Sequence, residues 1–269
     1  MPRLERSPKP VPLAKQVQTA LAALEALSTK RDLENLPRFG ITASNPLGVS
    51  MAKIQKLAKS IGRNHELACA LWDTDCYEAR LLTAYVAEPA RLTPAQMDRW
   101  CKDFDNWAVC DTLCFHLFDR VPHAWTQIYK WSNQRPEFVK RTAFALMASS
   151  AGHDKHASDD VFLEGLTLIE RAANDERNFV KKAVSWALRR IGRRNRALHR
   201  ACVELSARLA ASSDATERWV GRDAYRELTS VPVERGVRAK SEREKTQASA
   251  KRAVKSAPKK KTVARARQR

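Results

Sequence analysis

The sequence predicts an all-α protein, built as a HEAT-like helical repeat solenoid with a concave basic surface. No proline occurs between Pro136 and Pro232, and glycine is scarce, with 8 in 269 residues. Such stretches, rich in Ala, Leu and Arg, favour helix over sheet. A weak internal repeat indicates a stack of two-helix units of about 30 to 47 residues each, as in TPR, HEAT and armadillo arrays. No TPR consensus is present, which favours the HEAT-like alternative.

The repeat consists of segments that begin with an aromatic residue and continue as an amphipathic helix. Their first residues are 30, 31, 41 and 40 positions apart. The five segments are Tyr77–Leu81, Trp107–Asp111, Phe138–Thr142, Phe179–Ala183 and Trp219–Asp223.

Local signals place several helices in chain order. Residues 13–27 carry apolar side chains at helical spacing and predict an N-terminal helix. Residues 45–48, Asn-Pro-Leu-Gly, predict a loop before a helix that starts near Ser50. Residues 93–96, Thr-Pro-Ala-Gln, form a capping box with proline at the first helical position. Pro136 is expected to open the helix that bears Arg141.

The fourth residue of most repeat segments is basic. If the repeat helices stack in parallel, these side chains form a stripe along one surface, which solenoid curvature makes concave and suited to a duplex backbone. The alternative is that basic residues merely flank an apolar helix face. The five positions are Arg80, Cys110, Arg141, Lys182 and Arg222.

The chain carries a net charge of +19, and its C-terminal end supplies most of that excess. Residues 235–269 hold 14 Lys and Arg against 2 Glu, so the other residues carry only +7. We expect two regions: a repeat domain over residues 1–234 and a disordered Lys/Arg-rich tail over residues 235–269. Both regions indicate a polyanionic partner, although a solvated, nonspecific extension remains an alternative for the tail.

One block inside the repeat domain is basic without interruption. Residues 177–203 contain nine Lys and Arg and no acidic residue, whereas a merely solvated helix face usually mixes both signs. The block predicts contact with nucleic-acid phosphates and no base readout. It includes Lys181, Lys182, Arg189, Arg190 and Arg193.

Trp107 and Asp111 are the candidate reactive pair. Their spacing of four puts an indole and a carboxylate on one helix face. Electron-rich rings beside a carboxylate can hold a developing cation, and Arg141 and Trp186 recur in similar helical contexts. Trp107 could instead be a core aromatic of its repeat segment, Asp111 an ordinary surface carboxylate, and Trp186 a core residue. The remaining tryptophans assigned to packing are Trp72, Trp100, Trp125 and Trp131.

The six cysteines lack a CxxC pair. Cys110, Cys114 and His116 are close in sequence, but the usual zinc spacing and a second ligand pair are absent, so buried free thiols in a reducing compartment are expected, with no metal or cofactor. No apolar run approaches the ~18 residues of a membrane span, and residues 1–12 lack the apolar core of a secretory signal. We expect a cytoplasmic monomer, associated with the nucleoid if bacterial.

Over roughly residues 38–228 the sequence resembles the AlkD-like DNA alkylation repair proteins, a family of HEAT-like repeat DNA glycosylases. The resemblance is carried by four separated motifs in the same order. These are Arg38-Phe39 followed by Leu47-Gly48-Val49, then Trp107–Asp111, then Phe138–Arg141, and last Phe179–Lys182 running to Trp186–Arg189.

The resemblance implies roles for individual residues. Trp107 and Trp186 would line the cleft against the deoxyribose of the damaged nucleotide, and Asp111 would be the catalytic carboxylate. Arg141 would hold DNA near the lesion, and Arg189 would contact a phosphate. Two positions depart from the family pattern: Phe39 stands where members can carry tyrosine, and Asn106 where some carry a further tryptophan.

The implied function is base excision repair by a hydrolase, a monofunctional DNA glycosylase that removes cationic N3- or N7-alkylpurines from double-stranded DNA. Two alternatives stay open. One is a DNA-structure-binding member of the same fold without glycosylase activity, and the other is a helical-repeat scaffold for another protein.

Overall fold

The computed structural model describes residues 11–256, and this part of the chain is helical with no strand. The all-α HEAT-like prediction is therefore confirmed. Residues 1–10 and 257–269 lie outside the described residues, and with them most of the N-terminal segment and the end of the predicted tail.

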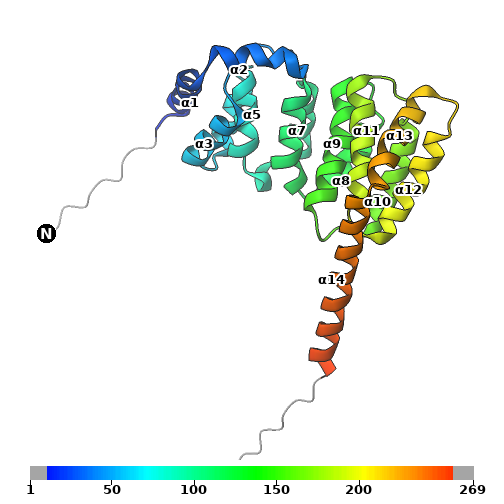
Figure 1. Ribbon diagram of the computed structural model, residues 1–269. Helices are drawn as coiled ribbons and strands as arrows, with labels where there is room; N and C mark the ends of the chain where they lie inside the picture. Colours follow the sequence, from blue (N-terminus) through cyan, green and yellow to red (C-terminus); the bar gives the residue numbers. More distant parts are fainter. Residues whose placement is uncertain (1–10, 257–269) are drawn as a thin grey trace, which may run out of the picture.

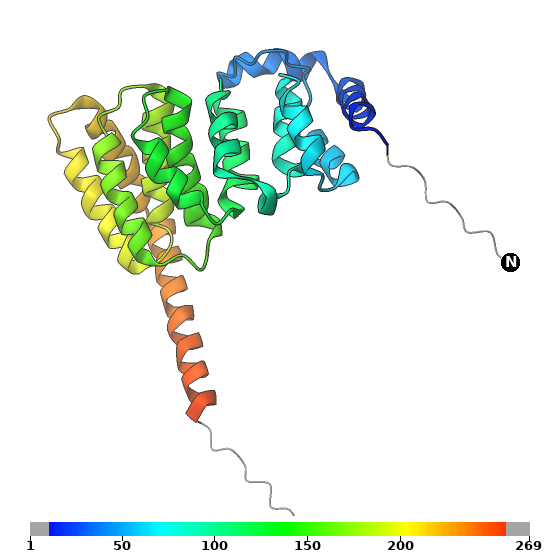
Figure 2. The same cartoon turned by 180° about the vertical axis from the view of Figure 1, so that it is seen from behind.

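The helices stack as a two-layered array (Figures 1 and 2). In the odd-numbered layer each helix packs on the next one, and α9 and α11 share the most extensive contact. This layer consists of α5 (Tyr77–Val86), α7 (Trp107–His116), α9 (Glu137–His153), α11 (Asn178–Ile191) and α13 (Ala215–Leu228), with α3 (Met51–Ile61) packed on α5. The even-numbered layer consists of α4 (His65–Trp72), α6 (Pro94–Lys102), α8 (Ala124–Ser132), α10 (Asp159–Ala172) and α12 (Arg196–Ala210).

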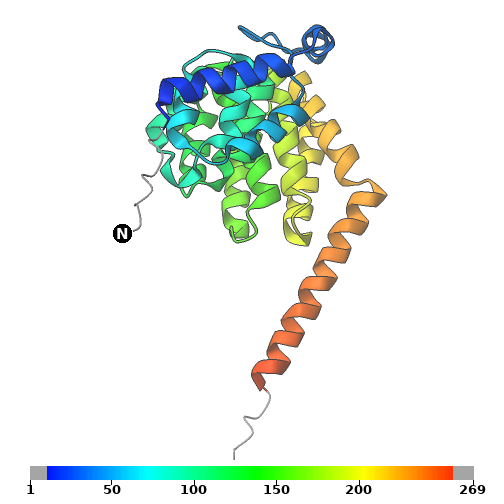
Figure 3. The same cartoon turned by 90° about the vertical axis from the view of Figure 1, so that its left-hand side faces the viewer.

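Two N-terminal helices and three 3₁₀ turns also belong to the array. The helix α1 (Leu13–Leu27) has the bounds that the apolar pattern predicts and lies across one end of the stack (Figure 3). The helix α2 (Lys30–Asn35) runs across the top of the array in Figure 1. The turns are η1 (Leu36–Phe39), η2 (Pro89–Arg91) and η3 (Phe118–Arg120).

The sequence repeat corresponds to the odd-numbered layer. Tyr77, Trp107, Phe138 and Phe179 lie in the first turn of α5, α7, α9 and α11, and Trp219 lies one turn into α13. The predicted starts also hold, because Pro136 directly precedes α9 and the Thr93 hydroxyl accepts from the Gln96 N–H at 3.2 Å at the start of α6. Local capping chemistry therefore fixes where these helices begin.

The predicted stripe of basic fourth positions is not continuous. Lys182 and Arg222 are exposed, but Arg80 and Arg141 turn inward. Arg80 forms an ion pair with Asp75 at 2.8 Å and lies over the Trp72 ring, and Arg141 is buried against a carboxylate described below. Each buried guanidinium meets a carboxylate or an aromatic face, which lowers the cost of removing it from water.

The tryptophans assigned to packing lie in or against the core. Trp72 and Trp100 stack with ring centroids 4.9 Å apart, and Trp131 is buried with its indole N–H donating to Asp98 at 2.8 Å. Trp125 is partly buried and meets Phe162 edge to face.

The predicted disorder from residue 235 onward is not found over residues 235–256, where the structure has a long helix, α14 (Val231–Ser256). It starts at the edge of the array and projects away from it (Figures 1 and 3). The many like charges of residues 235–256 disfavour packing into a compact core, which was the reason to expect disorder. However, Ala, Lys, Arg, Glu and Gln are all strong helix formers, and Arg238 pairs with Glu242 one turn away at 3.1 Å.

Glu78 is a buried carboxylate that fixes the loop before α3. Its two oxygens accept from the backbone N–H groups of Leu47, Gly48 and Val49 at 2.8, 2.7 and 3.1 Å. Gly48 has a φ of 82°, and a Cβ there would meet the backbone of Thr29 and Leu33 at 2.7 Å. The loop therefore needs both the glycine and the carboxylate.

We predict that Glu78→Gln lowers the free energy of unfolding by about 2–4 kcal/mol, because an amide nitrogen would then face a buried backbone donor. Urea unfolding at pH 7 measures the loss. Glu25→Gln, which changes an exposed glutamate of α1, is the matched control and should leave stability within about 0.5 kcal/mol of the original. Equal stability of the two variants would contradict the assigned role of Glu78.

Candidate functional site

The helix α7 presents two predicted site residues and one further aromatic on consecutive turns. Asn106 caps it, with its side-chain oxygen accepting from the N–H groups of Ala108 and Val109 at 3.0 and 3.1 Å. This cap starts the helix at Trp107, so that Trp107, Asp111 and Phe115 follow at intervals of four on one face. Asn106, a departure from the family pattern, is therefore a helix-capping residue here.

Asp111 forms a two-pronged ion pair with Arg141 of α9. The Arg141 Nε donates to Oδ1 at 3.0 Å and Nη2 donates to Oδ2 at 2.7 Å. The third guanidinium nitrogen, Nη1, donates to the Phe179 carbonyl of α11 at 2.7 Å. The side chains are 7% and 16% exposed for Arg141 and Asp111, so the pair is largely removed from water while the carboxylate keeps some access to solvent.

Burial raises the pKa of the Asp111 carboxyl, and the Arg141 guanidinium acts against that shift. A bidentate guanidinium at these distances is a strong, charge-assisted partner. The arrangement holds the plane of the carboxylate in one orientation and makes Arg141 a bridge between α7, α9 and α11.

The Trp107 indole is partly buried and tied to the N-terminal end of the array. Its Nε1 donates to the Phe39 carbonyl of η1 at 3.0 Å. The Phe39 ring itself is 64% exposed, so a backbone atom of this residue positions Trp107 while its side chain faces solvent.

Trp186 of α11 reaches the same helix through Phe115. The two rings stack nearly parallel, at 8°, with centroids 5.0 Å apart. Phe115 also meets His153 edge to face at 5.6 Å, and the His153 Nδ1 lies 2.5 Å from the Asp119 carboxylate. Sequence reasoning missed Phe115, His153 and Asp119 as site neighbours. The signal for Phe115 was its position four residues after Asp111.

The basic block of α11 is partly neutralised by acidic residues of α13. Arg189 donates to Glu227 at 2.6 Å and lies 3.6 Å from Asp223, and Arg193 lies 2.7 Å from Glu227. These acids are 30 or more residues away in sequence, so the composition of the block alone could not show them.

The other predicted DNA contacts on α11 have different surroundings. The Lys181 ammonium lies over the Trp219 ring at 5.4 Å, and Lys182 is exposed. Within the described residues no carboxylate lies at ion-pair distance from Lys181, Lys182 or Arg190. Among the predicted contacts, these three side chains are therefore the ones whose charge no carboxylate of the described residues neutralises.

The cysteine thiols are free, and most of them are buried. Burial raises the pKa of Cys76 and Cys202, as expected for unreactive core thiols. Residues 11–256 contain no group of three or more His, Cys, Asp or Glu placed to hold a metal ion. No described helix is both long and apolar enough to cross a bilayer.

The stacked helix pairs define an all-α HEAT-like repeat protein, and a buried ion pair joins three of its consecutive repeat helices. The chain belongs to the DNA alkylation repair enzyme family, because the sequence model of that family matches residues 20–228.

One similar solved structure comes from a family of proteins described as related to the HEAT-like repeat DNA glycosylases, with affinity for branched DNA structures. It shares 19% identity with a TM-score of 0.67, over 78% of this chain and 94% of that one. A designed armadillo repeat protein in complex with a (KR)4 peptide reaches 12% identity and a TM-score of only 0.35, over 85% of this chain and 98% of that one. A comparison with curated proteins gave no significant match.

We predict that Arg141→Ala costs about 3–5 kcal/mol of unfolding free energy, because it leaves Asp111 buried without its partner. Without the guanidinium, burial alone acts on Asp111 and raises its pKa above the unfolded value of about 3.9. The folded variant therefore binds a proton more tightly than the unfolded chain does. The stability of the variant should be highest below the unfolded pKa of about 3.9 and should be lost as pH rises from there through the folded pKa of Asp111. Urea unfolding across this range measures the trend.

The double variant Arg141→Ala/Asp111→Asn is the control for the missing charge partner. It should recover stability relative to Arg141→Ala and lose the pH dependence. A single variant with no pH trend beyond that of the unchanged protein would contradict the coupling of the two groups.

We predict that Glu227→Gln strengthens binding to undamaged duplex DNA, because it leaves Arg189 and Arg193 without their shared carboxylate. Two further phosphate contacts would steepen the slope of log K against log salt by up to about 1.8. Fluorescence anisotropy at several salt concentrations measures the slope. Glu204→Gln removes an exposed glutamate on α12 as the matched control, and an equal effect there would show that only net charge matters.

Proposed function

We propose that the protein is a monofunctional DNA glycosylase that excises cationic N3- or N7-alkylpurines from double-stranded DNA. The observation that carries this proposal is the Asp111 carboxylate, which is oriented by Arg141 and flanked on its own helix by the aromatic rings of Trp107 and Phe115. Trp186 adds a further indole through its stack on Phe115.

The chemistry follows from the charge on the lesion. Alkylation at N3 or N7 makes the purine cationic, so the bond from C1′ to the base breaks with its electron pair leaving on a neutral alkylpurine. Positive charge then develops on the sugar. A carboxylate about 4 Å away stabilises such a charge by roughly 4 kcal/mol at an effective dielectric near 20, and indole faces add about 0.5–2 kcal/mol each.

Water completes the reaction by attacking C1′, and its proton passes to Asp111 or to solvent, leaving an abasic site. Because the leaving base is already cationic, no second carboxylate is needed as an acid, unlike in ordinary glycosidases. Lys140, the lysine next to Arg141, is engaged by Asp175 at 2.9 Å, which supports hydrolysis by water over a Schiff-base route and strand cleavage.

Positioning of Asp111 is the role that the contacts of Arg141 support best. Its three nitrogens already donate to Asp111 and to the Phe179 carbonyl. Each carboxylate oxygen keeps a lone pair for water or for the sugar, since an ionised carboxylate offers about four acceptor sites. Phosphate contact is assigned to Lys181, Lys182 and Arg190, with Arg189 and Arg193 sharing their charge with α13. The Phe39 ring, being exposed, can meet the DNA beside Trp107.

A second candidate function is binding of DNA structures without excision. The similar protein with affinity for branched DNA favours it, and so does the pairing of both Asp111 oxygens with Arg141. Excision from duplexes carrying 7-methylguanine or 3-methyladenine, measured beside affinity for a four-way junction, separates the two. A protein-binding scaffold predicts instead that affinity for the partner is insensitive to salt.

We predict that Asp111→Asn lowers the single-turnover excision rate by roughly 10–1000-fold, the range expected for losing one electrostatic group. Affinity for the lesion duplex should hold or rise, because a negative charge leaves a surface that faces phosphates. Quench-flow excision and anisotropy binding give the two numbers.

Asp160→Asn, at an exposed carboxylate on α10, is the matched control and should excise at the original rate. Melting temperatures of both variants separate chemistry from folding. An Asp111→Asn protein that is well folded and excises at the original rate would falsify the catalytic assignment.

A further inference from the structure

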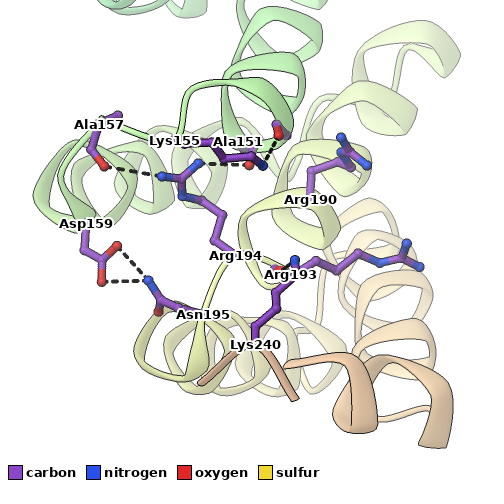
Figure 4. Close-up of a pocket in the computed structure, with 10 residues that line it drawn as sticks. Ala151, Lys155, Ala157, Asp159, Arg190, Arg193, Arg194, Asn195 and Lys240 are labelled. Atoms are coloured by element: carbon purple, nitrogen blue, oxygen red, sulfur yellow. Dashed lines mark hydrogen bonds between the residues drawn. The ribbon is translucent and has the colours of Figure 1, made fainter. Parts of the chain in front are cut away.

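A cationic cavity lies at the edge of the array, outside the Asp111 site. It has a volume of about 520 Å³ and is formed where the end of α9, the turn into α10, the end of α11 and the first turns of α14 meet (Figure 4). We call it the edge pocket. Its charged lining residues are Lys155, Asp159, Arg190, Arg193, Arg194 and Lys240.

Part of this lining is structural. Arg194 donates to the carbonyls of Ala151, Asp154 and Ala157 at 3.0, 2.7 and 3.3 Å, which ties the turn after α9 to the end of α11. Figure 4 shows the contacts with Ala151 and Ala157. Asp159 is the only carboxylate of the lining, and it accepts from the Asn195 amide at 2.8 and 3.0 Å. These contacts form one wall. Arg193 shares its charge with Glu227 at 2.7 Å, and Lys155, Arg190 and Lys240 contribute the further positive charge of the cavity.

The remaining cations surround the space from three segments. The Lys240 ammonium donates to the Arg193 carbonyl at 2.7 Å, and Lys155 donates to the Gly152 carbonyl, so each of these side chains is anchored to backbone at the rim. Arg190 has only a long contact of 3.5 Å to the Ala148 carbonyl. Burial, followed by the charge of Arg193, lowers the pKa of Arg190, as expected where positive charge is crowded.

Gly152 makes room for Arg190. A Cβ at this position would lie 1.9 Å from the Arg190 Nη2 and 3.0 Å from its Cζ. The guanidinium thus rests directly on the last turn of α9. Arg190 follows Trp186 by one helical turn, which places the pocket about 6–10 Å along α11 from the aromatic site.

We propose that the edge pocket binds a phosphomonoester, carried either by the end of a DNA strand or by a free nucleotide. Arginine and lysine are the usual ligands of phosphate, and a monoester concentrates nearly two negative charges where a backbone diester has one. Cations from three segments can surround a terminal group, whereas a diester continues in both directions and fits an open surface. The volume suits a small ligand or one terminal nucleotide.

The proposal rests on the DNA-binding part of the proposed function and not on base excision. If the chain binds strands at the Asp111 site, the pocket would recognise a phosphate at a nick or end nearby. Its test therefore uses a ratio of affinities, which is readable in a protein that excises nothing.

The first arm compares nicked duplexes whose nick carries a 5′-phosphate, a 3′-phosphate or hydroxyls only, by anisotropy with the full chain. The second arm compares deoxyadenosine monophosphate with deoxyadenosine by calorimetry. We expect one of the phosphorylated ligands to bind roughly ten-fold or more tightly than its hydroxyl counterpart. A preference in the first arm alone assigns the strand end, and one in the second alone the free nucleotide.

Two variants locate the preference. Arg190→Gln removes the charge, and Gly152→Ala displaces the guanidinium without removing it while adding a better helix former to α9. Both should abolish the preference. Arg200→Ala, at an exposed arginine on α12 outside the pocket, loses the same charge and should retain it. Equal affinity for monoester and hydroxyl ligands in both arms, or a preference that survives Arg190→Gln, overturns the proposal.

Discussion

The pairing of Asp111 with Arg141 is the interaction on which the rest of the site depends. It connects a carboxylate of α7, a guanidinium of α9 and the Phe179 carbonyl of α11 across consecutive repeats. A buried ion pair is weak support for stability, because desolvating both charges offsets much of their attraction. The contribution of this pair is positional. The bidentate Arg141 guanidinium fixes the Asp111 carboxylate relative to the aromatic side chains of α7, α9 and α11.

The same competition between charges sets how the basic surface works. The repeat region is only moderately basic, and α13 places Asp223 and Glu227 against Arg189 and Arg193. Guanidinium groups shared with a carboxylate attract phosphate less strongly than unpaired ones, so the attraction of the block for a phosphate differs from one cation to the next. Lys181, Lys182 and Arg190 have no carboxylate at ion-pair distance within the described residues, which a count of basic residues along the sequence would not reveal.

Local chemistry was readable from the sequence, and contacts between distant residues were not. Capping residues and apolar spacing gave the bounds of α1, the start of α9 and the aromatic first turns of the odd-numbered layer. Arg141 was expected to face DNA. It turns inward because it pairs with Asp111, which lies 30 residues earlier in the sequence, and sequence spacing alone did not reveal this partner. The helix after residue 235 was missed for the opposite reason: its like charge was weighed, but the helix propensity of its residues was not.

Pairing Asp111 also resolves a conflict that a nucleic-acid site imposes. A lone carboxylate about 7 Å from a phosphate would be repelled by roughly 2.4 kcal/mol at an effective dielectric near 20. A carboxylate joined to a guanidinium has no net charge, and at the distance of the phosphates the two fields largely cancel. In the proposed reaction, a sugar cation beside the partly exposed carboxylate would lie nearer to Asp111 than to Arg141, so the attraction would survive there. Under the proposed function, the pair would thus stabilise a cation locally without adding a net negative charge that repels the DNA backbone.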